Sequence, residues 1–200
     1  MAHPGSIPIT LTEIGIAGSI LFIAALVFTR IALTGISMEG RSWWLLKAAP
    51  ISAWEILRGK FLAAYVPFAI VNLMLLAGAA VWRQFGLLTF VYCALGTLLL
   101  GVGIMALCVG LSVPWARLDW DDPRRMSSGW GGLIAFILEV IYLSIGLGFW
   151  ALPALAYTFR PEWAGMAWFI GITGAIVITA IVSLPPLAFG ARRMGRVGDA

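Results

Sequence analysis

The chain has 200 residues and a net charge of +4, and 62% of its residues are hydrophobic while only 11% are charged. Soluble globular domains carry about 25% charged residues, and a chain of this size leaves too much of its surface exposed to hide so much apolar area inside itself. The composition therefore excludes a soluble domain and predicts an integral membrane protein.

Five apolar runs are long enough to cross a bilayer, whose hydrocarbon core requires roughly 20 residues of helix. A helix satisfies its own backbone hydrogen bonds, as the membrane interior requires. We therefore predict an all-α integral membrane helical bundle that forms a single transmembrane domain over residues 1–200. The predicted spans are approximately 14–36, 61–81, 87–113, 130–152 and 166–189.

The Lys and Arg residues lie mainly on one side of this predicted bundle. Eleven of the 13 fall on that side, and only Arg83 and Arg160 fall on the other. Short loops rich in Lys and Arg stay in the cytoplasm. The pattern predicts an N-terminus outside and a C-terminus inside, in the inner (plasma) membrane of the cell. Because the basic residues sit between apolar runs, the positive charge indicates contact with membrane lipids and no nucleic acid.

The first predicted cytoplasmic segment, residues 37–60, begins with the pattern of a short amphipathic helix. Trp43, Leu46 and Ala49 recur at three-residue spacing, as on one helical face. Pro50 ends this helix, because the residue before a proline avoids the helical region.

A second helix is predicted directly after this break. Ser52 followed by Glu55 is a capping-box pattern, in which each side chain bonds a free amide at a new helix start. That helix enters the second span. From these residues alone two interpretations stay open: an interfacial helix that only anchors the loop, or a docking surface for a partner.

The same segment contains an acidic residue with a glycine, a short apolar helix, a Pro-Ile-Ser turn, and an acidic residue before Gly-Lys. The residues are Glu39, Gly40, Leu45, Leu46, Pro50, Ile51, Ser52, Glu55, Gly59 and Lys60. This pattern resembles the signature region of the ABC-2 type permeases, the membrane subunits of one class of ATP-binding cassette exporter. In that family the region forms a cytoplasmic coupling helix that docks on the ATP-binding subunit.

The resemblance implies that the chain is the permease subunit, or its C-terminal portion, of an ABC exporter. ATP and Mg²⁺ would bind only on a separate ABC ATP-binding subunit, and hydrolysis there would drive substrate translocation. The chain itself would not be an enzyme and would pair with itself or a related permease subunit. The implied docking residues are Glu39, Gly40, Trp43, Leu46, Lys47, Pro50, Ser52, Glu55, Gly59 and Lys60.

One departure from the family favours an alternative. Members usually carry another span before the signature region, whereas this chain has one span ahead of it. The alternative is a non-transporting scaffold or accessory subunit of a larger membrane complex.

The second predicted cytoplasmic loop, residues 114–129, mixes acidic and basic side chains. Carboxylate oxygens are ligands for divalent cations, but the neighbouring arginines neutralise the aspartates at lower cost. We therefore predict a structural or docking loop on the same face as residues 37–60. The candidate residues are Asp119, Asp121, Asp122, Arg124 and Arg125.

Glu139 is the one acidic residue well inside a predicted span. Comparable charged residues cost about 2.5–3.5 kcal/mol at the centre of a membrane helix. The carboxyl is therefore expected to be protonated, paired or facing a polar cavity. It is either a substrate or proton contact on a translocation path, or a neutral acid bonded to a neighbouring helix.

Glycines in the third and fourth spans predict close helix packing. They are Gly96, Gly101, Gly103, Gly110, Gly129, Gly131, Gly132, Gly146 and Gly148.

No Gly-x-x-x-x-Gly-Lys-Ser/Thr phosphate-binding loop occurs in the sequence. We therefore expect no catalytic, cofactor-binding or metal-binding residue in this chain.

Overall fold

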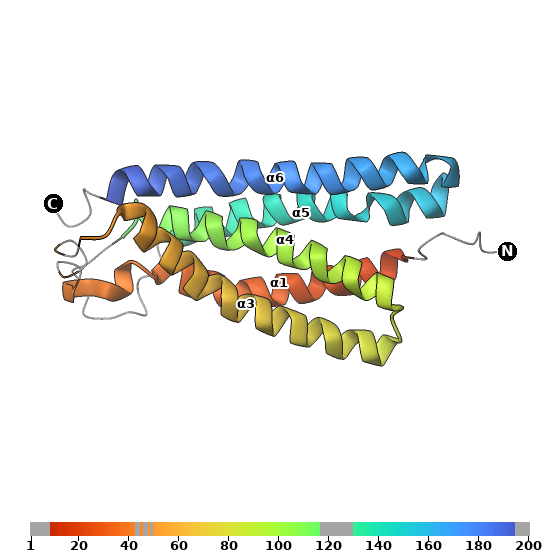
Figure 1. The fold of residues 1–200 in the computed structure, drawn as a ribbon, viewed down its shortest axis with the longest axis horizontal. Helices are drawn as coiled ribbons and strands as arrows, with labels where there is room; N and C mark the ends of the chain where they lie inside the picture. The colour runs from red at the N-terminus through yellow and green to blue at the C-terminus, as the bar shows by residue number, and fades with distance from the viewer. Residues whose placement is uncertain (1–8, 43–44, 46–47, 49, 117–129, 195–200) are drawn as a thin grey trace.

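The computed structural model describes the whole chain except residues 1–8, 43–44, 46–47, 49, 117–129 and 195–200 (Figure 1). The described residues form helices and contain no strand. The long helices are α1 (Leu11–Thr34), α3 (Ala53–Arg83), α4 (Leu87–Ser112), α5 (Trp130–Phe159) and α6 (Ala164–Arg193), and the short 3-10 segments are η1 (Ser37–Ser42) and η3 (Pro161–Trp163).

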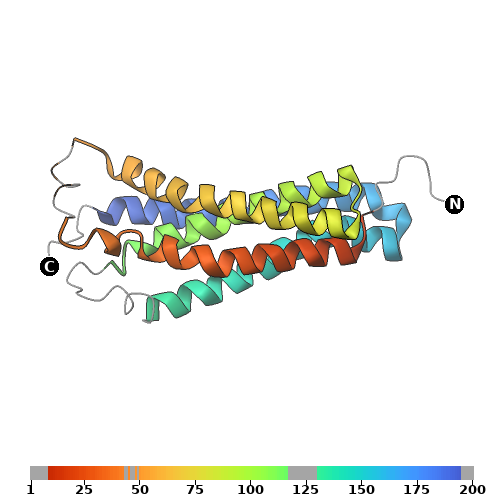
Figure 2. The ribbon, with the colours of Figure 1, turned by 90° about the horizontal axis from the view of Figure 1, so that it is seen from below.

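The long helices lie side by side in one elongated bundle (Figures 1 and 2). Within the described ranges, five helices are long and apolar enough to cross a membrane. This confirms the prediction of an all-α bundle with five such helices. The end of α1, the start of α3 and the end of α6 share one end of the bundle, and the α3–α4 turn lies at the other (Figure 1).

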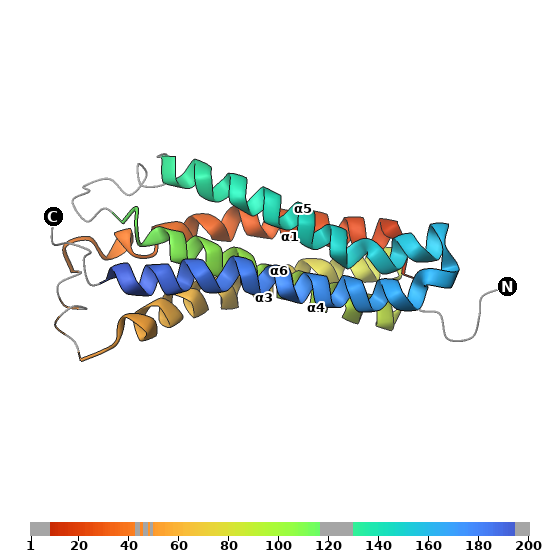
Figure 3. The ribbon, with the colours of Figure 1, turned by 90° about the horizontal axis from the view of Figure 1, so that it is seen from above.

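α4 is the most buried of the long helices. In its most hydrophobic stretch 72% of the residues lie inside the bundle, against 39% or less in the other four. In Figure 1, α4 runs between α5 and α6 on one side and α1 and α3 on the other. Figure 3, which is turned by 90° from Figure 1, shows α6 in front of α4, and the two helices are in contact. Every other long helix therefore packs on α4.

Two helices begin at reciprocal capping boxes. At α1, the amide of Glu13 donates to the Thr10 hydroxyl at 3.3 Å, and the Thr10 amide donates to the Glu13 carboxylate at 2.7 Å. At α3, the amide of Glu55 donates to Ser52 Oγ at 3.2 Å, and the Ser52 amide donates to the Glu55 carboxylate at 2.7 Å. These bonds satisfy amides that a helix start leaves unpaired, so the helix start predicted at Ser52 forms as expected.

Glycines let neighbouring helices approach α4 closely, as the sequence predicts. Gly103 faces the ring of Tyr142 on α5, and Gly110 faces the backbone of Pro186 on α6. A Cβ added at Gly110 would lie 2.4 Å from the Pro186 carbonyl carbon, nearer than real Cβ atoms come. Similar tight contacts occur at Gly96, Gly101, Gly131 and Gly146. Gly129 lies outside the described residues.

A methyl group at Gly110 should force α4 and α6 apart, because the Pro186 backbone cannot turn aside as a flexible side chain would. We expect Gly110→Ala to lower the free energy of unfolding by about 1–3 kcal/mol, the usual cost of overpacking. The measurement is denaturation of the purified protein in detergent, monitored by circular dichroism.

The prediction of close packing is wrong for Gly148, because an added Cβ there meets nothing within 4 Å. Gly148→Ala is therefore the matched control. Alanine favours helix over glycine, so this variant should be as stable as the parent or slightly more stable. Equal destabilisation by both substitutions would show that the Gly110 contact does not limit packing.

Candidate functional site

The end of the bundle at which α1 ends and α3 begins carries most of the described basic residues. We call it the basic end and define it by Arg30, Arg58, Lys60, Arg192 and Arg193. The last two lie in the final turn of α6, where positive charge is stabilised by the helix dipole. The opposite end carries Arg83 and Arg160.

An ion pair ties the segment after α1 to the start of α3. Lys60 Nζ of α3 donates to Glu39 Oε1 of η1, and the two side chains are 23% and 31% exposed. The residues are 21 positions apart in the chain. Sequence reasoning named both as docking residues and missed their contact. In the sequence, only their opposite charges indicate a possible contact, and many other pairs of residues also carry opposite charges.

The other described docking candidates lie on the surface of the basic end. Pro50, Ser52, Glu55 and Gly59 are all exposed, and Gly40 lies within η1. Trp54, which was not among the predicted residues, exposes 50% of its surface beside them. The sequence already shows this tryptophan next to the predicted helix start. It could therefore have been included among the predicted docking residues.

Several predicted site residues fall outside the described part of the chain. They are Trp43, Leu46 and Lys47 in the first segment, and Asp119, Asp121, Asp122, Arg124 and Arg125 in the second loop. Among the residues that are described, no group of three His, Cys, Asp or Glu side chains gathers to hold a metal ion.

Glu139 lies deep inside the bundle on α5, with 2% of its surface exposed. Its Oε1 atom has no hydrogen-bond partner among the described residues. One turn further along α5, the Tyr142 hydroxyl lies 2.8 Å from Thr179 Oγ1 on α6 and donates to the Leu100 carbonyl on α4 at 3.2 Å. A place for Glu139 on a translocation path stays a prediction.

A second buried polar group, which sequence reasoning missed, joins α3 to α4. Asn72 is fully buried, and its Nδ2 donates to Thr97 Oγ1 at 2.9 Å. Its Oδ1 has no hydrogen-bond partner among the described residues. Side-chain amides and hydroxyls commonly join helices in membranes. The available signal was a single amide within a long apolar run.

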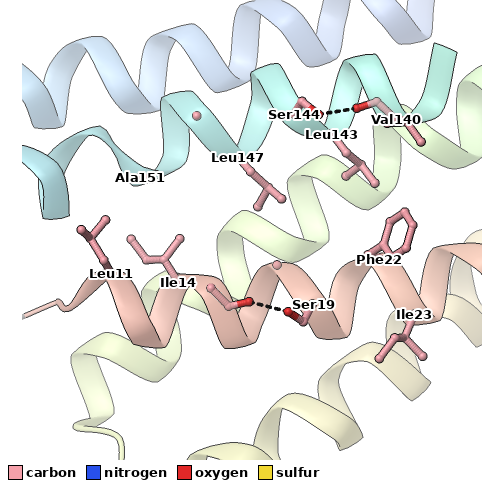
Figure 4. A pocket seen from close by; sticks show the side chains of 13 residues that line it. Leu11, Ile14, Ser19, Phe22, Ile23, Val140, Leu143, Ser144, Leu147 and Ala151 are labelled. Atoms are coloured by element: carbon pink, nitrogen blue, oxygen red, sulfur yellow. Dashed lines mark hydrogen bonds between the residues drawn. The ribbon is translucent and has the colours of Figure 1, made fainter. Parts of the chain in front are cut away.

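A groove of about 700 Å³ opens between α1 and α5 (Figure 4). Leu11, Ile14 and Phe22 on α1 face Leu143 and Leu147 on α5 across it. The two serines in its walls donate to carbonyl groups of their own helices at 2.8 Å, and they are Ser19 and Ser144. The groove therefore offers an apolar surface with both hydroxyl donors already satisfied.

A family model described as "Putative ATP-binding cassette" matches residues 9–198. No curated protein matches the chain, and no solved structure matches it.

This match corrects the sequence-based assignment. The family is a different one from the ABC-2 type permeases, so the assignment to that family and the exporter permease function drawn from it are wrong. The scaffold alternative does not follow from the match either. The resemblance rested on the segment between Glu39 and Lys60 and on hydropathy elsewhere, and hydropathy is shared by every multi-pass membrane protein.

The same match overturns two further expectations. The chain was predicted not to be an enzyme, and ATP with Mg²⁺ was predicted to bind only on a partner subunit. Both predictions are contradicted by a family description that names an ATP-binding cassette. The match covers nearly the whole 200-residue chain, and the chain therefore belongs to the family described as "Putative ATP-binding cassette".

Proposed function

We propose that this chain is the membrane-embedded component of an ATP-binding cassette system in the inner (plasma) membrane. The observation that carries the proposal is the combination of a family match over residues 9–198 with five helices long and apolar enough to cross a bilayer. The bundle holds the system in the membrane, and its basic end meets the water-soluble parts.

The distribution of charge supports a cytoplasmic position for the basic end. Lys and Arg near the ends of membrane helices favour the cytoplasmic side, and the described arginines and lysine gather where α1 ends, α3 begins and α6 ends. In the proposed orientation, the start of α1 and the α3–α4 turn lie on the outer side.

The proposed docking surface is the first turn of α3 with the segment that precedes it. Exposed Ile51 and Trp54 supply apolar contact, and Glu55 supplies negative charge. Aromatic residues are enriched at the centres of protein interfaces. The capping box fixes the start of α3 and the pair between Glu39 and Lys60 fixes η1 beside it, so the surface is rigid before a partner arrives. The partner proposed for it is an ABC ATP-binding subunit, and a second copy of the chain or a related membrane subunit completes the assembly.

The family description also favours nucleotide binding by this chain itself. The sequence has no phosphate-binding loop, so any phosphate contact uses other residues. Arginine side chains bind phosphate oxygens through paired hydrogen bonds, and Arg58, Arg192 and Arg193 are exposed at the basic end. Nucleotide contact at this surface is the second candidate function.

The orientation is tested by thiol labelling in intact cells. The native cysteines, Cys93 and Cys108, are buried, so they give little background with a membrane-impermeant reagent. We expect Gln84→Cys to be labelled from outside, because Gln84 lies exposed in the α3–α4 turn. Arg58→Cys should be labelled only after the membrane is made permeable. The reverse pattern would place the basic end outside and remove the proposed docking surface from the cytoplasm.

The docking surface is tested by cross-linking from Glu55→Cys in membranes, with Gln84→Cys at the opposite end as control. We expect a cross-linked partner from an ATP-binding cassette system only from Glu55→Cys, and we expect a photoreactive ATP to label this chain. Label on this chain itself, without a partner, would support nucleotide binding by the chain. Absence of both would contradict the proposed function.

A charge-reversal pair sharpens the same experiment. Lys60→Glu places two negative charges together and should reduce cross-linking, while the double variant Glu39→Lys with Lys60→Glu restores opposite charges and should recover it. Ion pairs near the protein surface contribute only about 0.2–1 kcal/mol, so both variants should fold. If the double variant fails to recover cross-linking, the ion pair does not position the surface.

A further inference from the structure

We propose that Glu139 is a proton-binding site inside the membrane, whose carboxyl carries a proton in the closed bundle and exchanges it with water at the basic end. The inference concerns the proton alone. It goes beyond the membrane-component function and does not depend on a partner, a nucleotide or a transported substrate.

The first support is the burial of an acid that has an unpaired oxygen. Glu139 exposes 2% of its surface, and its Oε1 atom has no hydrogen-bond partner in the described part of the chain. An ionised carboxylate is expensive in such surroundings unless a cation or several donors face it. A bound proton removes that charge.

Among the residues that the structure describes, the groups that face Glu139 offer no such cation. Cys108 of α4 lies within electrostatic range of the carboxyl, and Cys108 itself is fully buried. The other charged or titratable groups on α1, α4, α5 and α6 lie at other levels of the bundle or on its surface, except for the paired Tyr142. They are Glu13, Arg30, Tyr92, Cys93, Tyr157, Arg192 and Arg193.

Helix geometry places one hydroxyl group, that of Ser183, at the level of the carboxyl. Tyr142 on α5 pairs with Thr179 on the antiparallel α6. One turn toward the basic end, α5 carries Glu139 and α6 carries Ser183, because each residue rises about 1.5 Å along a helix. The Ser183 hydroxyl donates to the Thr179 carbonyl at 2.7 Å, so its oxygen remains free to accept a hydrogen bond. A hydroxyl oxygen can accept a hydrogen bond from a protonated acid, whereas an ionised carboxylate would need a cation or several donors.

The same geometry indicates the route of exchange. Glu139 lies nine residues from the start of α5 at Trp130 and twenty from its end at Phe159, distances of about 14 and 30 Å along the helix. The basic end is therefore the nearer source of water. Separation of α4, α5 and α6 at that end would admit water and let the proton leave, whereas the outer path is longer and passes the Tyr142 contacts.

The test uses the full-length protein in lipid vesicles and dicyclohexylcarbodiimide, an apolar reagent that reacts with protonated carboxyl groups in membranes. The carboxyl oxygen bonds to the central carbon of the carbodiimide, the carboxyl proton passes to its nitrogen, and the adduct rearranges to a stable N-acylurea. Peptide mass spectrometry should find this adduct at Glu139, with labelling that falls as the pH is raised.

Glu139→Gln should lose the adduct, and Glu162→Gln, which removes an exposed carboxyl near η3, should keep it. Absence of an adduct at Glu139 in the folded parent would overturn the proposal. Labelling that stays constant into the alkaline range would identify a permanently neutral acid and overturn proton exchange.

Infrared spectroscopy keeps the inference testable if Glu139→Gln does not fold. The parent protein should show the carbonyl band of a protonated carboxyl, and that band should shift after transfer to D₂O. Carboxylate bands alone, or a protonated band that never shifts, would overturn the proposal.

Discussion

The bundle depends on the close approach of its neighbours to α4. Lipid tails are as apolar as leucine, so helices in a membrane gain little from burying hydrophobic surface against each other. What remains is van der Waals packing, and glycine makes it possible where Gly103 meets Tyr142 and Gly110 meets the Pro186 backbone. Removing side chains from α4 brings the neighbouring helices near enough for the polar contacts between them to form.

Those polar contacts share one pattern. Tyr142 reaches Thr179 and the Leu100 carbonyl, and the Tyr92 hydroxyl donates to the Trp150 carbonyl at 2.6 Å. Each bond joins two helices by means of a hydroxyl or a backbone carbonyl that a helix already holds in place. Three buried polar atoms among the described residues lack such a partner, and they are Glu139 Oε1, Asn72 Oδ1 and Trp150 Nε1. Of these three side chains, the glutamic acid is the one whose charge depends on a bound proton.

Local features of this fold were predictable from sequence, and long-range contacts were not. The start of α3 followed from Ser52 and Glu55, which lie three residues apart and need no tertiary information. The helices followed from apolar runs whose length must match the bilayer, although α3 begins at Ala53, before the predicted span. The pairing of Glu39 with Lys60 depends on how η1 turns back toward α3, and the groove between α1 and α5 depends on their separation. Neither is encoded by spacing along the chain.

The family assignment failed for a related reason. A short cytoplasmic segment carried the resemblance, while the apolar helices, which make up most of the chain, agree in hydropathy with many unrelated membrane proteins. A match across residues 9–198 weighs all the helices together and places the chain in a different family. The all-α architecture could be predicted from the sequence because a bilayer requires long apolar segments to form helices. The bilayer places no such requirement on the family to which a chain belongs.

The length of α3 gives the basic end a mechanical consequence. Its 31 residues extend about 46 Å, well beyond the roughly 30 Å of a hydrocarbon core. A single helix therefore joins the surface around Trp54 to the turn at Gln84, and a force applied at one end would tilt the other end. Pro67 lies inside this helix and removes a backbone hydrogen bond there, which makes it the weakest point of the lever and the place where such a force would bend it.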